Sequence, residues 1–172
     1  PHDFARFNAR MNQPGGFWRG NPAHDRIWKT ESGKAEFTVP DALNALDFDA
    51  APGRYRLITM RSNDQFNTTV YGFSDRFRGI EGTREVVLMN AEDMAEAGLA
   101  HGERVALVGD AGDGILRRRG GLSVVTFALP RGTVAGYYPE TNVLIPIAHH
   151  DRLSKTPASK GVPVRIEREA SG

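Results

Sequence analysis

The sequence predicts a mainly β protein with short helices, folded as a closed or nearly closed barrel behind an irregular N-terminal arm. Short apolar, strand-like runs recur from residue 54 to residue 167, and only one stretch carries clear helix start and stop signals. Many short strands avoid exposed edges by closing on themselves. The first 34 residues are rich in Gly, Pro, Asn and Arg and show no regular period. We therefore expect an irregular arm over residues 1–34 and one barrel domain over residues 35–172.

Composition limits the classes of protein that the chain could represent. Its 172 residues, 40% of them hydrophobic, can bury one ordinary core. The 22 basic and 21 acidic residues are mixed along the chain, so no overall field favours nucleic acid or an anionic membrane. The absence of cysteine excludes disulfides, thiolate nucleophiles and cysteine-held metal or iron–sulfur sites in this segment. No window approaches the roughly 20 apolar residues that span a bilayer. We expect a soluble, cytoplasmic protein.

Before the first clear strand, the patterns predict short elements. Residues 34–39 alternate polar and apolar side chains and stop at Pro40, which predicts a short strand because proline cannot donate to a sheet. Residues 41–46 suit a single helical turn. Residues 54–60 then predict a strand, and residues 69–82 predict a loop that packs its own aromatic side chains.

The clearest local unit is a strand, a helix and a returning strand. Residues 85–89 are continuously apolar after the first position, and Asn90 is a good helix cap. Gly98 suits the left-handed position that ends a helix. We expect a short helix over residues 92–97 and a strand over residues 103–108.

The C-terminal half predicts mostly strands and turns. Residues 109–114 are small and acidic and predict a turn, after which strands are expected over residues 115–119 and 122–129. A second loop follows at 139–142, and a last strand is expected over residues 163–167. The strand-like runs supply a predicted barrel core of Leu57, Val86, Leu88, Val105, Leu107, Val124, Val125, Phe127 and Ile166.

A polar run at residues 61–69 follows the strand at 54–60 directly. Its amides and hydroxyls can both donate and accept hydrogen bonds, and Arg61 is suited to a phosphate group. The residue types alone are equally compatible with a binding edge and with a hydrogen-bonded turn that binds nothing.

The sequence gives little support to nucleophilic catalysis, metal binding, a phosphate-binding loop or RNA binding. No serine lies in a Gly-x-Ser-x-Gly elbow, and the five histidines have no motif around them. His149 and His150 are adjacent and would point to opposite faces of an extended segment, so a shared metal is not expected. The glycines of 109–114 lack the Gly-Lys-Ser/Thr that follows in a phosphate-binding loop. The run at 117–121 suggests a solvated turn rather than an RNA site.

Three loop motifs, in this order, resemble the C-terminal dinucleotide-binding domain of molybdopterin oxidoreductases. They are residues 57–72 (LITMRSNDQFNTTVYG), 137–144 (YYPETNVL) and 154–160 (SKTPASK). Residues 28–37 and 90–107 are also similar to segments of that domain. Within the family, the chain most resembles formate dehydrogenase-like alpha subunits.

The resemblance implies a six-stranded double-psi β-barrel that binds molybdopterin guanine dinucleotide, as Mo-bis-MGD, without catalysing a reaction alone. It implies as partners the remaining domains of the same catalytic subunit and an electron-transfer subunit, with no nucleic acid and no membrane span. Any iron–sulfur cluster would lie in upstream regions. Thr141 departs from the alanine of many relatives, and Phe66-Asn67 departs from the aromatic-histidine pair of nitrate reductase-like members. The implied cofactor-binding residues are Arg61, Ser62, Asn63, Asp64, Gln65, Phe66, Asn67, Thr68, Tyr138, Asn142 and Lys160.

Two alternatives share the expected fold. A free-standing barrel could serve as an interaction module for a protein or nucleic acid. A self-processing decarboxylase of similar fold would need a Gly-Ser cleavage pair, and the sequence contains no Gly-Ser dipeptide.

Overall fold

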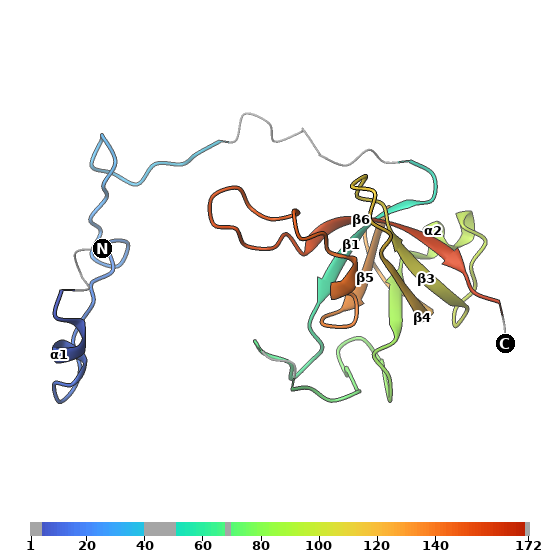
Figure 1. Cartoon of the computed structure of the whole chain (residues 1–172), viewed down its shortest axis with the longest axis horizontal. Coiled ribbons are helices and arrows are strands. Elements are labelled where there is room, and N and C mark those ends of the chain that lie inside the picture. Colours follow the sequence, from blue (N-terminus) through green and yellow to red (C-terminus); the bar gives the residue numbers. More distant parts are fainter. Residues whose placement is uncertain (1–4, 40–50, 68–69, 171–172) are drawn as a thin grey trace. The chain divides into compact units, whose positions relative to one another are not determined.

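The computed structural model describes residues 5–39, 51–67 and 70–170, and the chain divides into two compact units, Pro1–Ala45 and Leu46–Gly172 (Figure 1). In the first unit, helix α1 spans Phe7–Met11. The ring of Phe17 meets that of Phe7 edge to face at 5.8 Å, and the guanidinium of Arg10 lies 3.8 Å from the Phe17 ring centroid. The described part of the predicted arm thus contains one short helix.

The prediction of a strand over residues 34–39 is wrong. These residues form no strand, and Phe37 is 99% exposed. Alternation specifies a strand only where a partner strand and a core face are present, and described residues 34–39 pair with no other strand. The helical turn predicted over 41–46 lies outside the described residues.

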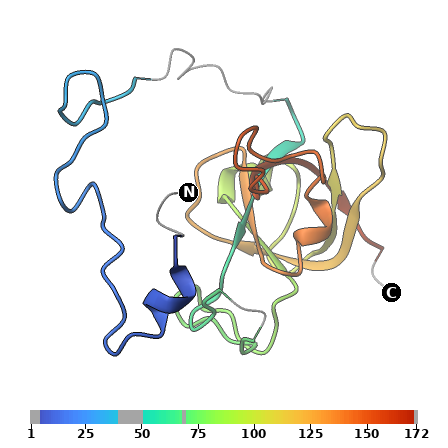
Figure 2. The same cartoon turned by 60° about the vertical axis from the view of Figure 1, so that its left-hand side comes forward.

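The second unit is a closed six-stranded barrel, seen from two directions in Figures 1 and 2. The order of strands around it is β1-β5-β2-β4-β3-β6. The pairs β1–β5 and β2–β4 are parallel and the other four pairs are antiparallel. This confirms the predicted fold class. Its elements are β1 Arg54–Met60, β2 Val86–Met89, α2 Ala91–Glu96, β3 Arg104–Gly109, β4 Arg118–Thr126, β5 Thr133–Tyr137, the 3-10 helix η2 Asn142–Leu144 and β6 Lys160–Arg168.

Strand pairing brings distant segments to one end of the barrel. Strands β1 and β5 are parallel, with Met60 opposite Tyr137, so the loops that follow them leave at the same end. Strand β6 runs antiparallel to β1, with Lys160 opposite Ile58, so β6 begins at that end. The polar run, the loop after β5 and Lys160 therefore meet although they are far apart in sequence.

The strand–helix–strand unit forms as predicted. The side chain of Asn90 accepts a hydrogen bond from the amide of Glu92 at 2.8 Å, and Gly98 has φ of 66° where the helix ends. Buried Asp93 accepts hydrogen bonds from Nε of Arg131 at 2.9 Å and from the amide of Gly132 at 2.7 Å. Helix α2 is thereby tied to the start of β5.

The two strands predicted over 115–119 and 122–129 are a single strand, β4, that runs through Gly120 and Gly121. A side chain at Gly120 would collide with the carboxylate of Glu169, which accepts a hydrogen bond from the amide of Gly121 at 2.8 Å. The glycine pair thus gives a carboxylate room beside a strand. Arg118 and Arg119 belong to this strand, so the interpretation of 117–121 as a solvated turn is also wrong.

The loop between β1 and β2 is irregular over its described residues, as predicted, and one isolated bridge joins Asp75 to Ile80. Its aromatic side chains pack only in part. The rings of Tyr71 and Phe73 meet at 6.5 Å, whereas the side chain of Phe77 is 71% exposed.

Of the nine predicted core residues, six are buried, and Val125, Phe127 and Ile166 are partly buried against the core. Strand β1 alternates half-buried and buried positions, as expected for one face turned inward. Across the described parts of the chain, no helix combines the length and apolar character needed to cross a membrane.

Candidate functional site

The polar run contains a tight turn from which two side chains, those of Ser62 and Gln65, face inward. The amide of Gln65 donates to the carbonyl of Ser62 at 3.2 Å, and the amide of Ser62 donates to Oε1 of Gln65, also at 3.2 Å. The side-chain amide of Gln65 then donates to the carbonyl of Tyr138 at 2.9 Å. Ser62 and Gln65 are buried, so these two predicted site residues join the loops after β1 and β5 to each other.

A cavity of about 650 Å³ lies where β1 ends and β6 begins. It brings together four of the predicted site residues, namely Arg61, Tyr138, Asn142 and Lys160. Asn142 is the first residue of η2, which follows the cis peptide between Tyr138 and Pro139. The complete lining is Thr59, Met60, Arg61, Tyr138, Asn142, Ile145, Pro157, Ser159 and Lys160.

Of the remaining predicted site residues, Asn63 is half-buried, Asp64, Phe66 and Asn67 are exposed, and none of these four lines the cavity. The side-chain amide of Asn63 donates to the carboxylate of Asp64 at 2.6 Å, and Asp64 adopts a left-handed φ of 63°. The side chain of Phe66 is 77% exposed, and Asn67 is exposed. Thr68 lies outside the described residues.

The cavity is cationic. It has two cations, Arg61 and Lys160, and no carboxylate among its described lining residues. The ammonium group of Lys160 donates to the carbonyl of Thr59. Burial lowers the pKa of Lys160, and the neighbouring charge of Arg61 lowers it further. An anion bound between these cations would relieve their repulsion, and Asn142 adds an amide that can both donate and accept. The donor set fits a phosphate-bearing ligand.

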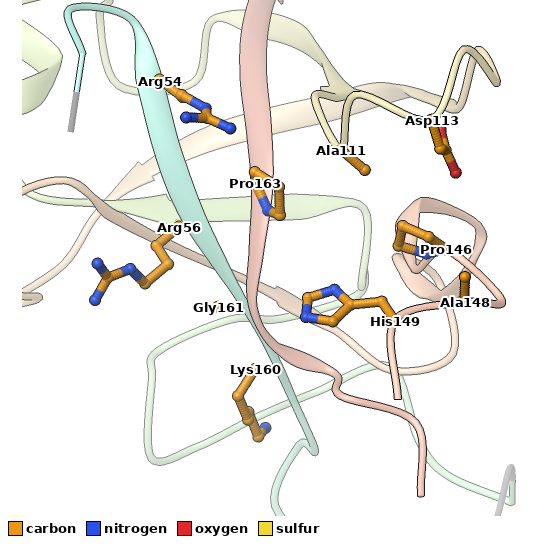
Figure 3. A pocket seen from close by; sticks show the side chains of 10 residues that line it. All are labelled: Arg54, Arg56, Ala111, Asp113, Pro146, Ala148, His149, Lys160, Gly161 and Pro163. Atoms are coloured by element: carbon orange, nitrogen blue, oxygen red, sulfur yellow. The ribbon is translucent and has the colours of Figure 1, made fainter. Parts of the chain in front are cut away.

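A second cavity, of about 540 Å³, shares Lys160 with the first (Figure 3). Arg54 and Arg56 of β1 line it, together with Asp113 and His149. Its carboxylate is already paired, because Asp113 accepts from Arg117 at 2.8 Å. No group of three or more His, Asp or Glu side chains among the described residues could hold a metal ion.

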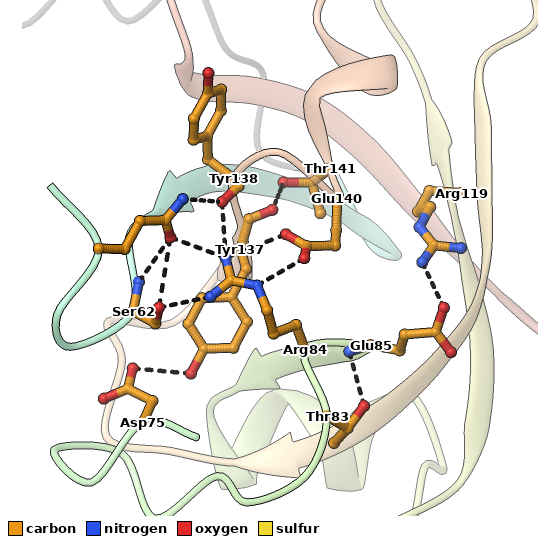
Figure 4. A network of polar contacts seen from close by, with 11 residues as sticks. Ser62, Asp75, Thr83, Arg84, Glu85, Arg119, Tyr137, Tyr138, Glu140 and Thr141 are labelled. Carbon is orange, nitrogen blue, oxygen red and sulfur yellow. Dashed lines mark hydrogen bonds and ion pairs between the residues drawn. The ribbon is translucent and has the colours of Figure 1, made fainter. Parts of the chain in front are cut away.

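Sequence reasoning missed Arg84, whose side chain is only 2% exposed (Figure 4). Its guanidinium donates to both oxygens of Glu140, at 2.6 and 3.2 Å, and to the carbonyl of Tyr138 at 2.7 Å. It also donates to the hydroxyl of Ser62 at 2.5 Å and to Oε1 of Gln65 at 2.9 Å. A single arginine before a strand belongs to no motif, so no sequence signal marked it.

A second buried cluster supports the same loops. The hydroxyl of Tyr137 donates to Asp75 at 2.9 Å, and Arg78 donates both to Asp75 at 2.5 Å and to the carbonyl of Arg61 at 3.2 Å. Burial raises the pKa of Tyr137, and the Asp75 carboxylate raises it further. Burial alone would raise the pKa of Asp75, but the hydrogen bonds from Arg78 and Tyr137 outweigh it and lower that pKa.

Fold and site together define a class of protein. It is a closed β-barrel with a cationic cavity at one end, built from loops that carry amide, hydroxyl and guanidinium groups. Such an end is suited to an extended phosphate-bearing ligand.

The chain belongs to the family of molybdopterin dinucleotide-binding domains. The family model described as "Molydopterin dinucleotide binding domain" matches residues 55–163, which run from β1 into β6. The matched segment includes every predicted site residue. The predicted family is confirmed, and a free-standing interaction module is not favoured.

Curated relatives are longer proteins. The chain is 42% identical over 174 residues to "Uncharacterized oxidoreductase Rv2900c" of Mycobacterium tuberculosis, in a match that covers 95% of this chain and 21% of the relative. It is 39% identical over 167 residues to "Protein YdeP" of Escherichia coli K12, with 96% of this chain and 22% of the relative covered. The chain thus spans about a fifth of the length of the curated relatives it matches.

Proposed function

We propose that this domain binds the molybdopterin guanine dinucleotide of a molybdenum-dependent oxidoreductase of the formate dehydrogenase-like type. The observation that carries the proposal is the meeting of Arg61 and Lys160 on one cavity whose described lining residues include no carboxylate. The family match supports a molybdopterin-type dinucleotide. The guanine base and the formate dehydrogenase-like type rest on the sequence resemblance.

Within this proposal, each lining residue binds the part of the cofactor that suits its chemistry. Arg61 and Lys160 hold the diphosphate, because charge-assisted hydrogen bonds to phosphate are the strongest available there. Asn142 offers a donor and an acceptor to the base, and Tyr138 presents an aromatic ring beside it. Ser62 and Gln65 contribute through the shape of their loop. Asn63, Asp64, Phe66, Asn67 and Thr68 remain proposed contacts along the rest of the polar run.

When bound, the cofactor supplies the redox chemistry at its metal, and the domain binds and orients it. We propose that the remaining domains of the same catalytic subunit and an electron-transfer subunit are its partners, with any iron–sulfur cluster in those regions. Three phenylalanines on the polar run and the following loop support packing against other domains, because large apolar side chains seldom stay in water together. Their exposed fractions are 77% for Phe66, 63% for Phe73 and 71% for Phe77. Location in the cytoplasm stays a prediction.

The test is loss of cofactor in the oxidoreductase polypeptide that carries this domain. Arg61→Ala and Lys160→Ala should each weaken dinucleotide binding by about 1.5 to 3 kcal/mol, the worth of a hydrogen bond to a charged group. That is roughly a 10- to 150-fold loss of affinity. Nucleotide released by acid should be GMP, and it should be measured with molybdenum content and circular dichroism. Formate oxidation with an artificial electron acceptor tests the substrate separately.

Lys155→Ala is a matched control, since Lys155 lies in the same segment as Lys160 but is not among the described residues that line the cavity. It should keep the full complement of cofactor. A correctly folded Arg61→Ala/Lys160→Ala double variant that also keeps its full complement would remove this assignment of the cavity.

A further inference from the structure

Arg84 joins the two loops that line the cationic cavity, although it is not itself among the described lining residues. We propose that Arg84 is a positioning residue, which sets the separation of these loops and thereby the affinity for the dinucleotide. The inference rests on the proposed function of the cavity. Nothing in the family match or the named relatives assigns a role to this residue.

The guanidinium of Arg84 reaches both loops. Toward the loop after β1, it donates to the side chains of Ser62 and Gln65, at 2.5 and 2.9 Å (Figure 4). Toward the loop after β5, it donates to the carbonyl of Tyr138 at 2.7 Å and to the carboxylate of Glu140. Opening the gap between the loops would break one set of these bonds.

The residues that Arg84 contacts adjoin the cavity. Ser62 directly follows Arg61, and the carbonyl that accepts from Arg84 belongs to Tyr138, which lines the cavity itself. A shift of a fraction of an ångström at Arg84 would therefore pass directly to two of the groups proposed to hold the ligand. Displacements of that size matter because phosphate recognition depends on donor direction as well as distance.

The position of Arg84 requires an arginine and not merely a cation. The guanidinium lies 3.8 Å from the centroid of the Tyr71 ring and 4.5 Å from that of Tyr137. Planar guanidinium groups can contact aromatic faces while their edges donate in several directions, whereas the ammonium of lysine is a compact point charge. Lysine would keep the charge opposite Glu140 and lose the simultaneous reach to both loops.

The role can be separated from general stability with a matched arginine elsewhere in the barrel. Arg131 is also paired with a buried carboxylate, that of Asp93, at 2.9 Å. It precedes β5, whereas Tyr138 follows β5, so the two arginines serve opposite ends of that strand. Arg84→Lys and Arg131→Lys should both lower the melting temperature of the full-length oxidoreductase.

Only Arg84→Lys should weaken dinucleotide binding, by about tenfold, when retained GMP is compared at equal folded fractions. The proposal is overturned if Arg131→Lys releases as much cofactor as Arg84→Lys, or if a folded Arg84→Lys variant keeps all of it. Should Arg84→Lys fail to fold, Glu140→Gln tests the same positioning role of Arg84. This substitution removes the negative charge that pairs with Arg84 but keeps one oxygen acceptor. It should lower retention several-fold, and full retention in folded protein would equally overturn the proposal.

A double-variant cycle distinguishes this inference from the assignment of the cavity. If Arg84 acts through the position of Arg61, the loss caused by Arg84→Lys should shrink at least threefold in the Arg61→Ala background. Because Arg84 is proposed to set the position of Arg61 relative to Tyr138, losses that stay additive in the Arg61→Ala background would mean that it does not act by setting this separation, and would overturn the proposal. If Arg61→Ala and Lys160→Ala retain all cofactor while Arg84→Lys loses it, the cavity assignment fails and the inference, which rests on it, fails with it.

Discussion

The pKa of Lys160 depends on which charges lie near it in the cavity. Its ammonium contacts the carbonyl of Thr59, and burial together with Arg61 lowers its pKa. An anion bound between Arg61 and Lys160 would raise this pKa again. The folded domain without its ligand therefore binds fewer protons at alkaline pH than the unfolded chain does.

The sign of the pH dependence follows from this difference. Between the lowered pKa of folded Lys160 and the ordinary value of 10.5, the unfolded chain binds more protons, so stability rises with pH. Below that window both states are charged, and the unfavourable contribution is fully present. Lys160→Met should make the ligand-free domain more stable at neutral pH and reduce this rise, as measured by chemical denaturation from pH 7 to 10.5.

Nuclear magnetic resonance can follow the same group directly. Arg61→Ala should raise the pKa of Lys160, and added pyrophosphate should raise it in the unmodified domain. The Lys160 side-chain carbon shift reports both changes. A Lys160 that titrates at its ordinary value in the unmodified domain would contradict the electrostatic account of the cavity.

At the scale of single residues, the sequence predicts some of the residues that line the cavity but does not mark Arg84, and the reason is physical. Arg61 and Lys160 belong to runs of polar residues, and the resemblance marks both. Arg84 acts through partners at positions 62, 65, 138 and 140, which come together only when β1 and β5 pair. No local pattern could reveal such a contact, because its partners lie on two other loops.

Among the elements, the loop after β5 depends on a glycine within the strand. A side chain at Gly136 would place its Cβ 2.5 Å from Cγ2 of Thr141, whose own side chain is fully buried. The hydroxyl of Thr141 donates to the carbonyl of Tyr137 at 2.8 Å and closes the turn that precedes Asn142. The side chain of Thr141 is thus packed directly on the strand.

Gly136→Ala should therefore destabilise the domain by about 1 to 3 kcal/mol, because the crowded loop must move away from β5. Thr141→Ser removes the colliding methyl group and keeps the hydroxyl. The cost of Gly136→Ala should accordingly be smaller in a Thr141→Ser background, and urea denaturation of the four proteins measures the coupling. An equal cost in both backgrounds would show that Thr141 does not limit the space at Gly136.

The elements differ in how far sequence alone could place them. Strand β1 could be predicted from its own alternating apolar residues, and helix α2 from Asn90 at its start and Gly98 at its end. Residues 34–39 have similar alternation but no pairing partner, and β4 contains a glycine pair that suggested a break. The lack of a pairing partner among the described residues explains residues 34–39, and the approach of Glu169 explains the glycine pair of β4. Both depend on residues distant in sequence.

For the whole molecule, we expect different dynamics in its two units. Of the described residues in the arm, only Phe7–Met11 form a helix, and Trp18 is 70% exposed. If the packing surface for the arm belongs to other domains, backbone amides in residues 5–27 should exchange rapidly in this segment alone and slowly in the longer oxidoreductase. Hydrogen exchange with mass spectrometry measures both. Uniformly slow exchange in the segment alone would argue that the arm packs independently.

The position of Lys160 has a consequence for the order of events during synthesis. Strand β6 is the last element of the barrel, yet it pairs with β1 and β3 and supplies one of the two cations of the cavity. Until the ribosome has released β6, the barrel stays open between β1 and β3. If the cavity holds the dinucleotide as proposed, loading must follow translation of β6, and a chain truncated before β6 would be excluded from maturation.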